Sequence, residues 1–451
     1  MSDATTRTER LLRRVRALGL APKVDVGAPL DEASLRALLE PLRSSTSERP
    51  RADSVRGRAG RVRERVARAW SATLARLSRD APFSDDNTVE VYCDGDVAFE
   101  EMLEAIARAD RRVWFETYIF ADDPLGRRVR DALVDARARG VEVTLLYDAF
   151  GSNDLDEGFF APLVAAGGRV VAFNPVALFA RGPTRQIALP LTLRDHRKIL
   201  VVDDARAFAG GMNVSADYAG KKLGNARFRD THLSVTGTAA RDLARTFVES
   251  FARATGERLV VGEAPRASGG TTVAQVLRAD PWSSRRQIQR ALRRALSRAV
   301  SRAWVTTPYF VPPRTLLGAL CRAARRGVDV RVLTAGDSDV PIVRLASWHF
   351  YDRLLASGVR VFELEARTLH AKTTTIDGLY GTVGSFNLDH WSHRRLLEVN
   401  VAMVDGAHAR ALETQFVHDL EGAREVTRER LAHRSVFARV LAWLAALVVR
   451  I

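Results

Sequence analysis

Residues 112–120 of this chain read Arg-Val-Trp-Phe-Glu-Thr-Tyr-Ile-Phe, and residues 302–310 read Arg-Ala-Trp-Val-Thr-Thr-Pro-Tyr-Phe. After each stretch come a helical pattern and then an Arg-Gly-Val turn that opens a second apolar run, at 139–146 and 326–333. Because strand, helix and turn signals return in the same order, we predict two copies of one domain. Short Val/Ile/Leu/Phe runs that alternate with Ala/Arg/Leu helical patterns are typical of α/β layers.

The two copies divide the chain into four segments. We expect a basic helical extension and linker over residues 1–84, a first domain over 85–258, a second domain over 259–425 and a helical tail over 426–451. Among the first eighty residues, 18 basic side chains face 10 acidic ones, so the extension holds about half of the excess positive charge of the whole chain.

The extension contains a candidate amphipathic helix. Apolar side chains recur at spacings of four and three among arginines, at Val62, Val66, Trp70, Leu74 and Leu77. Two interpretations stay open: the apolar stripe packs on the main body, or it lies in an anionic membrane interface. A further helix is expected over residues 31–43, followed by a linker over 43–53.

The composition excludes several classes of protein. With 451 residues and 46% hydrophobic side chains, the chain can fill real cores and is neither disordered nor fibrous. Its 69 lysines and arginines exceed 54 aspartates and glutamates, which favours anionic partners without choosing between phospholipid and nucleic acid. Cys93 and Cys321, the two cysteines, exclude a disulfide-rich scaffold and a cysteine-based zinc cluster.

No segment has the pattern of a membrane span. The first thirty residues do not resemble a signal peptide, because they are rich in arginine and lack a continuous apolar stretch. The best apolar run, Val440–Val449, is about half the length that crosses a bilayer. We therefore expect any work at a membrane to be done from its surface.

Each copy carries the same five residue types at the same offsets. They are His196, Lys198, Asp203, Gly210 and Asn213 in the first copy, and His370, Lys372, Asp377, Gly384 and Asn387 in the second. The chain has only nine histidines and five lysines, so composition does not supply the coincidence. The repeated set predicts one functional site to which each copy contributes half.

The spacing indicates what each member does. Residues two apart on a strand project from the same face, so each histidine should lie beside its lysine. Asp203 and Asp377 end their strands at turns, and we expect them to be structural caps. The backbone at Gly211 and Ser385 can approach a ligand closely, whereas the amides of Asn213 and Asn387 can donate to a phosphate oxygen.

Two imidazoles and two ammonium groups around one point form an anion site that can do covalent chemistry. A neutral histidine can attack a phosphodiester while its protonated partner acts as the acid, and an alcohol or water then resolves the phosphohistidine. Chemistry alone leaves the two histidines interchangeable. Lys198, Lys372, Asn213 and Asn387 are suited to stabilise the charge on the equatorial oxygens. We expect no cofactor and no metal, because protonated lysines repel a divalent cation and a carboxylate-rich shell is missing.

The pattern His-x-Lys-x4-Asp followed by Gly-[Gly/Ser]-x-Asn, twice in one chain, resembles the phospholipase D superfamily. The stretches 116–120, 194–198, 210–213, 229–232 and 307–311 resemble bacterial cardiolipin synthases of the short type without N-terminal transmembrane helices. The resemblance implies two tandem α/β/α sandwich domains related by a pseudo-twofold axis, with the active site at their interface.

The same resemblance implies a role for each acid and base. His196 would be the nucleophile, and His370 the general acid and then the base for the incoming alcohol. Asp230 and Glu398 match the acids that orient the histidine of the opposite copy in the superfamily. A plain structural ion pair remains the alternative for either acid.

The leading functional hypothesis is phosphatidyl transfer from one phosphatidylglycerol to another, yielding cardiolipin and glycerol. The protein would work peripherally on the cytoplasmic face of the bacterial membrane, with anionic phospholipid as its partner. Alternatives are a phospholipase D that hydrolyses lipids, a nuclease of the same superfamily and a catalytically silent scaffold. A nucleic acid partner is disfavoured because the extension lacks interleaved aromatic residues. The tail over 436–449 either dips into the lipid interface or docks on the body as a last helix.

Overall fold

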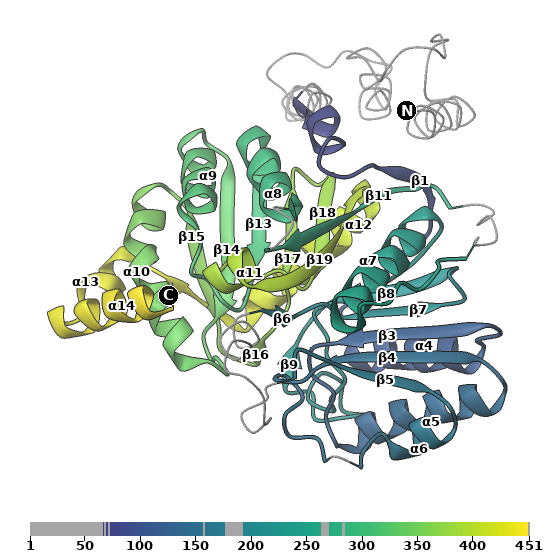
Figure 1. Ribbon diagram of the computed structural model, residues 1–451. Helices are drawn as coiled ribbons and strands as arrows, with labels where there is room; N and C mark the ends of the chain where they lie inside the picture. Colours follow the sequence, from purple (N-terminus) through teal and green to yellow (C-terminus); the bar gives the residue numbers. More distant parts are fainter. Residues whose placement is uncertain are drawn as a thin grey trace, which may run out of the picture.

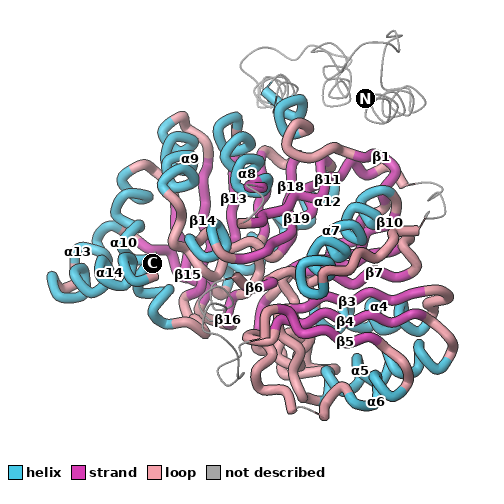
Figure 2. Tube along the Cα trace, viewed as in Figure 1, coloured by secondary structure: helices cyan, strands magenta, loops and turns pink. Residues whose placement is uncertain are grey.

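Two β-sheets, one centred on each half of the chain, form the framework of the protein (Figures 1 and 2). The computed structural model describes residues 66, 69–70, 73–156, 158–175, 193–262, 270–281 and 285–449. The first sheet has seven strands, in the order β2 (Val89–Tyr92), β10 (His232–Thr236), β8 (Arg206–Gly210), β7 (Ile199–Val202), β3 (Arg112–Thr117), β4 (Glu142–Asp148) and β5 (Arg169–Phe173).

The second sheet follows the order β1 (Ser84–Asn87), β11 (Thr272–Asp280), β19 (Leu396–Val404), β18 (Tyr380–Gly384), β17 (Thr373–Ile376), β13 (Arg302–Thr306), β14 (Asp329–Ala335), β15 (Arg360–Leu364) and β20 (Ala423–Val426). Off this path, β12 (Arg285–Arg286) pairs with β11, and β6 (Arg194–Asp195) pairs with β19. A separate two-stranded ladder joins β9 (Phe228–Arg229) to β16 (Thr368–Leu369).

Six strands of each sheet share one topology. The order β10-β8-β7-β3-β4-β5 in the first sheet matches β19-β18-β17-β13-β14-β15 in the second. In both, the strand that begins with the repeated Arg-x-Trp sequence, β3 or β13, pairs parallel with one neighbour and antiparallel with the other. This confirms the prediction of two α/β domains built alike.

Helices flank both sheets. The first domain contains α4 (Gly95–Ala107), α5 (Pro124–Ala138), α6 (Ala161–Ala165) and α7 (Thr238–Thr255). The second domain and the tail contain α8 (Gln287–Arg298), α9 (Arg314–Arg325), α10 (Pro341–Ala356), α11 (His390–Arg394), α12 (Gly406–Glu421), α13 (Arg428–Ala432) and α14 (Val436–Val448).

Helix boundaries follow local chemistry. A side-chain oxygen of Asp123 accepts the backbone N–H of Gly126 at 2.8 Å, and Pro124 occupies the first turn of α5, where its missing N–H costs nothing. Past the other end of α5, Gly140 has φ of 90°, and its counterpart after α9, Gly327, has φ of 87°. Only glycine adopts this conformation without strain, which explains why the Arg-Gly-Val turn occurs in both copies.

The two domains share a hydrophobic core. One cluster packs α4 and α5 on the first sheet, and another packs α8, α9 and α10 on the second. A third cluster joins Phe247 and Phe251 of α7 and Leu233 of the first sheet to Val276 and Val399 of the second sheet. Helix α7 accordingly lies where the two sheets meet (Figure 1). Burial of apolar surface from both domains stabilises the contact between them.

The described part of the N-terminal extension packs on the second domain. Val66, Trp70, Leu74 and Leu77 belong to that domain's core, and the Trp70 ring stacks on Tyr380 with centroids 5.4 Å apart. For these residues the first interpretation of the stripe, packing on the body, is the correct one. Val62, the helix expected over 31–43 and the linker over 43–53 lie outside the described residues. Strand β1 then enters the second sheet before the chain starts the first domain.

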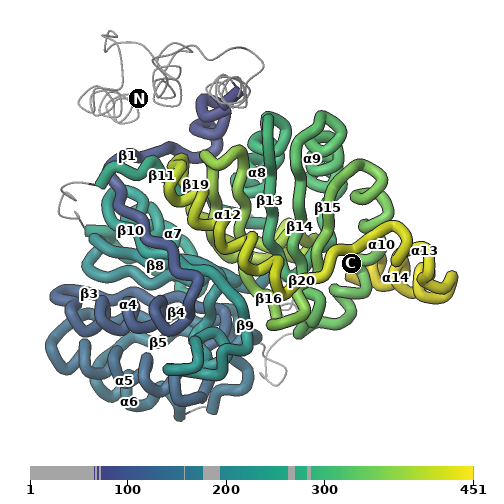
Figure 3. The backbone as a smooth tube through the Cα atoms, turned by 180° about the vertical axis from the view of Figure 1, so that it is seen from behind, coloured from purple at the N-terminus to yellow at the C-terminus, as the bar shows by residue number. Residues whose placement is uncertain are grey.

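The C-terminal helices lie at the far edge of the second domain. Helix α14 packs along α10, and both views show α13 and α14 standing out from the body (Figures 1 and 3). Within the described residues, no helix combines the length and apolar character needed to cross a bilayer.

Candidate active site

A short backbone pairing between the domains precedes each motif histidine. Strand β6 runs parallel to the start of β19, so that the backbone N–H of His196 donates to the carbonyl of Leu397 at 3.0 Å. Strand β16 pairs in parallel with β9, and the N–H of His370 donates to the carbonyl of Arg229 at 2.8 Å. The next residues along the partner strands are Glu398 and Asp230. Each histidine is thereby placed beside an acid of the opposite domain.

The side chains complete these crosswise pairs. His196 Nδ1 lies 3.2 Å from Glu398 Oε2, and His370 Nδ1 lies 2.6 Å from Asp230 Oδ2. All four side chains are buried. A carboxylate that accepts the Nδ1–H fixes the imidazole tautomer and leaves the lone pair on Nε2 available for chemistry.

The four basic motif groups share one site at the domain interface. Burial lowers the pKa of His196 well below its usual range, and the charges of Lys198, Lys372 and His370 act in the same direction. Together with the contacts of each histidine to an acid of the opposite domain, this influence places the basic groups of both copies at the interface between the domains.

Both lysines are buried and anchored to their own histidines. Lys198 Nζ donates to the backbone carbonyl of His196 at 2.8 Å. Lys372 Nζ donates to the carbonyl of His370 and lies 2.9 Å from its Nδ1. Burial lowers the pKa of Lys198 to about 7 and that of Lys372 to about 8. A bound phosphate would restore both ammonium groups, because an anion favours the charged form.

The two acids have different surroundings. Glu398 accepts hydrogen bonds from the hydroxyl groups of Ser385 and Ser392, the latter at 2.6 Å, yet burial raises the pKa of its carboxyl to about 8. Burial pushes the pKa of Asp230 upward, but His370, Lys372 and the backbone N–H of Thr231 together outweigh burial and hold that pKa below its usual range. Of the two, Asp230 is the better partner for a charged imidazole.

Gly211 and Ser385 occupy corresponding positions in the two copies. They account for part of the difference between the surroundings of Asp230 and those of Glu398. A Cβ at Gly211 would lie 2.2 Å from Asp230 Oδ1, so the position has no room for a side chain. In the second domain Ser385 reaches its acid with a hydroxyl group instead. At this position of the motif, Asp230 therefore lies against a glycine without a side chain, whereas Glu398 receives a hydrogen bond from a serine hydroxyl group.

The two asparagines also differ. Asn213 Nδ2 donates to the hydroxyl of Tyr218 at 2.7 Å, while its Oδ1 accepts the N–H of Ile119 at 3.1 Å. Asn387 Oδ1 is buried and has no hydrogen-bond partner in the described part of the chain. Only the first asparagine is therefore held at both ends of its amide.

Two tyrosines lie near the histidines, and they were not identified as site residues from the sequence. The Tyr118 ring lies 4.9 Å from the His196 ring, with Lys198 Nζ 5.1 Å from its centroid. The Tyr218 ring lies 5.1 Å from the His370 ring, and its hydroxyl is 3.5 Å from Nε2. A search for residues common to both copies passes over them, because the second copy has Pro308 and Ser392 at the corresponding positions.

Asp203 and Asp377 lie away from the histidines, in the turns after β7 and β17. Asp203 accepts the backbone N–H groups of residues 110–112, and Asp377 those of residues 300–302. Both have φ near 55°, at 54° and 57°. Each carboxylate holds the segment that leads into the neighbouring strand.

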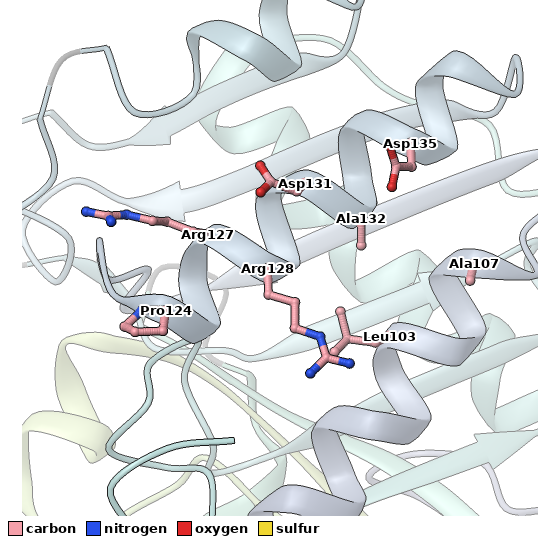
Figure 4. Close-up of a pocket in the computed structure, with 8 residues that line it drawn as sticks. All are labelled: Leu103, Ala107, Pro124, Arg127, Arg128, Asp131, Ala132 and Asp135. Atoms are coloured by element: carbon pink, nitrogen blue, oxygen red, sulfur yellow. The ribbon is translucent and has the colours of Figure 1, made fainter. Parts of the chain in front are cut away.

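One described hollow lies away from the motif residues. A hollow of about 600 Å³ lies between α4 and α5, lined by Leu103, Arg127, Arg128 and Asp131 among others, but by none of the motif residues (Figure 4). Among the described residues, no group of three or more histidine, cysteine, aspartate and glutamate side chains could hold a metal ion.

Comparison with known proteins identifies the family of the chain. The family model described as "Cardiolipin synthase, PLD-like domain" matches residues 102–226 and 292–420. The chain is 32% identical to the major cardiolipin synthase of Bacillus subtilis over 371 residues, which covers 81% of this chain and 75% of that protein. It is 31% identical to a cardiolipin synthase of Clostridium perfringens, covering 80% of this chain and 76% of that protein.

The fold has a counterpart among solved structures. The phosphatidylserine synthase of Haemophilus influenzae aligns with a TM-score of 0.62 and 14% identity, over 84% of this chain and 99% of that one. At this identity the likeness concerns the fold alone. Taken with the family model and the sequence relatives, it leads to one conclusion: the chain belongs to the family of cardiolipin synthases with phospholipase D-like domains, which are phosphatidyltransferases of the phospholipase D type.

Proposed function

We propose that this protein synthesises cardiolipin by transferring a phosphatidyl group from one phosphatidylglycerol to another through a phosphohistidine. The observation that carries the proposal is the crosswise pairing, in which each motif histidine meets an acid of the opposite domain at 3.2 or 2.6 Å. The family of the chain supports the lipid substrates.

In the first step, His196 Nε2 attacks the phosphorus of the donor phosphatidylglycerol. A P–N bond forms while the P–O bond to the headgroup glycerol breaks, and His370 gives its Nε2 proton to the departing glycerol oxygen. Lys198 and Lys372 stabilise the negative charge on the phosphoryl oxygens. The products of this step are free glycerol and phosphatidyl-His196.

In the second step, a hydroxyl group of the acceptor phosphatidylglycerol takes the place that glycerol has left. His370, now neutral, removes the hydroxyl proton as the oxygen attacks phosphorus and the P–N bond breaks. His196 is regenerated, His370 again carries its proton, and the new phosphodiester is that of cardiolipin.

The unequal acids support this assignment of the two histidines. The 2.6 Å contact between Asp230 and His370 favours an imidazolium, because the carboxylate keeps a lowered pKa. His196 is paired at 3.2 Å with Glu398, whose pKa is raised, and its own pKa is strongly lowered by burial. Burial and the charge of Lys372 also lower the pKa of His370, but the pKa of His196 lies well below its usual range. The environment therefore favours His370 over His196 as the protonated partner, and His196 as the neutral nucleophile, two roles that chemistry alone leaves interchangeable.

We propose that the reaction takes place on the cytoplasmic face of the membrane, with the protein bound peripherally to anionic phospholipid. The excess of 69 basic over 54 acidic side chains supports this partner, since each lysine or arginine near an anionic surface contributes about 1 kcal/mol to attraction. The proposed steps use protein side chains only and need neither a metal ion nor nucleic acid.

The proposal is tested with purified protein and phosphatidylglycerol vesicles in EDTA. We expect cardiolipin and glycerol in equal amounts. Phosphatidic acid as the sole lipid product would instead identify a hydrolase, and loss of turnover in EDTA would contradict metal independence. His196→Ala and His370→Ala should each lower turnover by at least about a thousandfold, since each removes a reacting group.

The covalent intermediate is tested separately. Protein quenched at alkaline pH after mixing with short-chain phosphatidylglycerol should carry one added phosphatidyl mass on the peptide that contains residue 196. The adduct should be absent from His196→Ala. An adduct on the peptide that contains residue 370 would reverse the proposed roles.

A further inference from the structure

Helix α14 buries its small side chains and exposes its large ones. Ala442, Ala445 and Ala446 are buried against the body, whereas Phe437 is 75% exposed and Trp443 is 48% exposed. Six further large apolar side chains of this helix are at least 38% exposed: Val436, Val440, Leu441, Leu444, Leu447 and Val448. At 100° per residue, the eight exposed positions cover a continuous arc of about 160°. A helix that serves only to complete the core has the opposite arrangement.

The inner face of α14 is nevertheless firmly docked. The guanidinium group of Arg434, just before the helix, lies 3.8 Å from the centroid of the Trp348 ring on α10. At the other end, the indole N–H of Trp391 donates to the carbonyl of Val449 at 3.1 Å. The body therefore holds α14 in a defined position at the edge of the molecule (Figures 1 and 3), and the side chains of its apolar arc are exposed.

The charge of the tail identifies the partner. Residues 426–451 contain five arginines and one glutamate. Arg439 is exposed and stands beside the apolar arc. A wide apolar face next to cationic side chains is complementary to a surface that is apolar inside and anionic at its rim. An exposed tryptophan is also typical of the boundary between headgroups and acyl chains.

Helix α14 is connected to the active site by a short chain of contacts. Its last turn is bonded to Trp391 in α11, and Ser392 of the same short helix donates to Glu398 at 2.6 Å. Glu398 in turn contacts His196. A surface that receives α14 would thus be connected to the proposed nucleophile through α11 and Glu398.

We propose that α14 lies flat in the headgroup and acyl boundary of an anionic bilayer, with its Val436–Val448 face inserted, and thereby keeps the second domain and its half of the paired histidines and acids at the lipid surface. The helix is about 20 Å long, which is too short to span the hydrocarbon core of about 30 Å, so it lies on the membrane. The second half of the statement rests on the proposed function, whereas lipid docking by α14 stands independently of it.

The test replaces three exposed residues that make no described contact with the catalytic groups. The variant Phe437→Ser, Leu441→Ser, Leu444→Ser is compared with the wild type and with a matched control, Val164→Ser, Val260→Ser, Val417→Ser. The control valines are 55%, 79% and 48% exposed and lie elsewhere on the surface. All three proteins are first compared by thermal unfolding and by size-exclusion chromatography.

Binding is measured by co-sedimentation with equimolar phosphatidylglycerol and phosphatidylcholine vesicles, and activity on the same vesicles. We expect the α14 variant to bind at least tenfold more weakly and to lose activity on vesicles in proportion. The matched control should behave as wild type. Turnover of dihexanoyl phosphatidylglycerol, presented as single molecules below its critical micelle concentration, should stay within twofold for all three proteins.

Several results would overturn the inference. Unchanged vesicle binding by the α14 variant refutes it, and so does an equal loss in the matched control. If the wild type is a dimer that the α14 variant converts to a monomer without loss of vesicle binding, a second copy covers the helix and the lipid assignment is wrong. If no protein makes cardiolipin but the α14 variant alone loses vesicle binding, lipid docking is supported and the proposed function fails.

Discussion

Gly211 offers a sharp test of the crosswise pairing, because a single methyl group there acts on one acid. In Gly211→Ala the new Cβ would lie 2.2 Å from Asp230 Oδ1 and 2.6 Å from Oδ2. Real Cβ atoms essentially never approach closer than 3.0 Å, so the carboxylate must retreat by about 0.8 Å. The φ angle of Gly211 is not in the left-handed region, so alanine introduces no backbone strain of its own.

The expected effect follows from the bond that is displaced. Asp230 Oδ2 lies 2.6 Å from His370 Nδ1, and a retreat of about 0.8 Å stretches this contact past the ordinary limit of about 3.2 Å. A hydrogen bond to a charged group contributes about 1.5–3 kcal/mol, which corresponds to roughly 10- to 150-fold in rate. A misplacement of about 1 Å in a catalytic group costs on the order of a hundredfold. We therefore expect kcat to fall by about a hundredfold.

The assay is cardiolipin formation from phosphatidylglycerol vesicles over a range of pH. Because the carboxylate supports the protonated form of His370, its retreat should shift the alkaline limb of the kcat profile to lower pH. Gly158→Ala is the matched control, since a Cβ at Gly158 meets nothing within 4 Å. Gly211→Ala with wild-type kcat, an unchanged pH profile and an unchanged melting temperature would refute the view that Asp230 must be held against His370.

Three further substitutions probe the lysines, a turn aspartate and the serine beside Glu398. Burial lowers the pKa of Lys198 to about 7 and of Lys372 to about 8, so wild-type kcat/KM should fall as the pH rises through this range. Lys372→Arg should make this fall less steep and lower the maximum of kcat/KM. A wild-type profile that stays flat to pH 10 would contradict the role of the two lysines as charged groups. Asp377→Ala should reduce the free energy of unfolding, measured in urea, by about 3 kcal/mol, because it removes the acceptor for three backbone N–H groups. The kcat per folded molecule should stay unchanged. Lost activity at unchanged stability would contradict a structural role for Asp377. Ser392→Ala removes a hydrogen-bond donor that lowers the pKa of Glu398, so the acidic limb of the kcat/KM profile should move to higher pH. Ser392→Thr should restore the wild-type profile. If the acidic limb does not move in the alanine variant, the Ser392 hydroxyl group does not act on Glu398.

Much of the fold could be predicted from the sequence because its signals are local. The apolar runs, the N-cap aspartates and the glycines of the Arg-Gly-Val turns act within a few residues of themselves. The same signals occur twice, as at Gly140 and Gly327, and the two sheets accordingly have the same strand order. The packing of Trp70 could not be predicted in this way, since its partners Tyr380 and Asp377 lie about 300 positions away in sequence.

The site could be predicted only in part, because some of its residues occur at the same offset in both copies and others do not. Repeated offsets reveal the histidines and lysines, since both copies need the same groups. Asp230 and Glu398 lie at different distances from their own histidines, so the repeat does not mark them, and resemblance to a family was needed to name them. Neither the repeated offsets nor the family resemblance identified Tyr218, whose counterpart in the second copy is a serine.

By itself, the sequence determined that this protein has twin α/β domains, and it predicted that each carries half of a phosphate-directed site, since both conclusions rest on local patterns that occur twice. Only the tertiary structure decided which acid meets which histidine, how Glu398 and Asp230 differ, and that α14 turns its large side chains outward. The physical reason is that hydrogen bonds, burial and pKa depend on which remote segments meet. The contacts from His196 to Glu398 and from His370 to Asp230 join residues 202 and 140 positions apart.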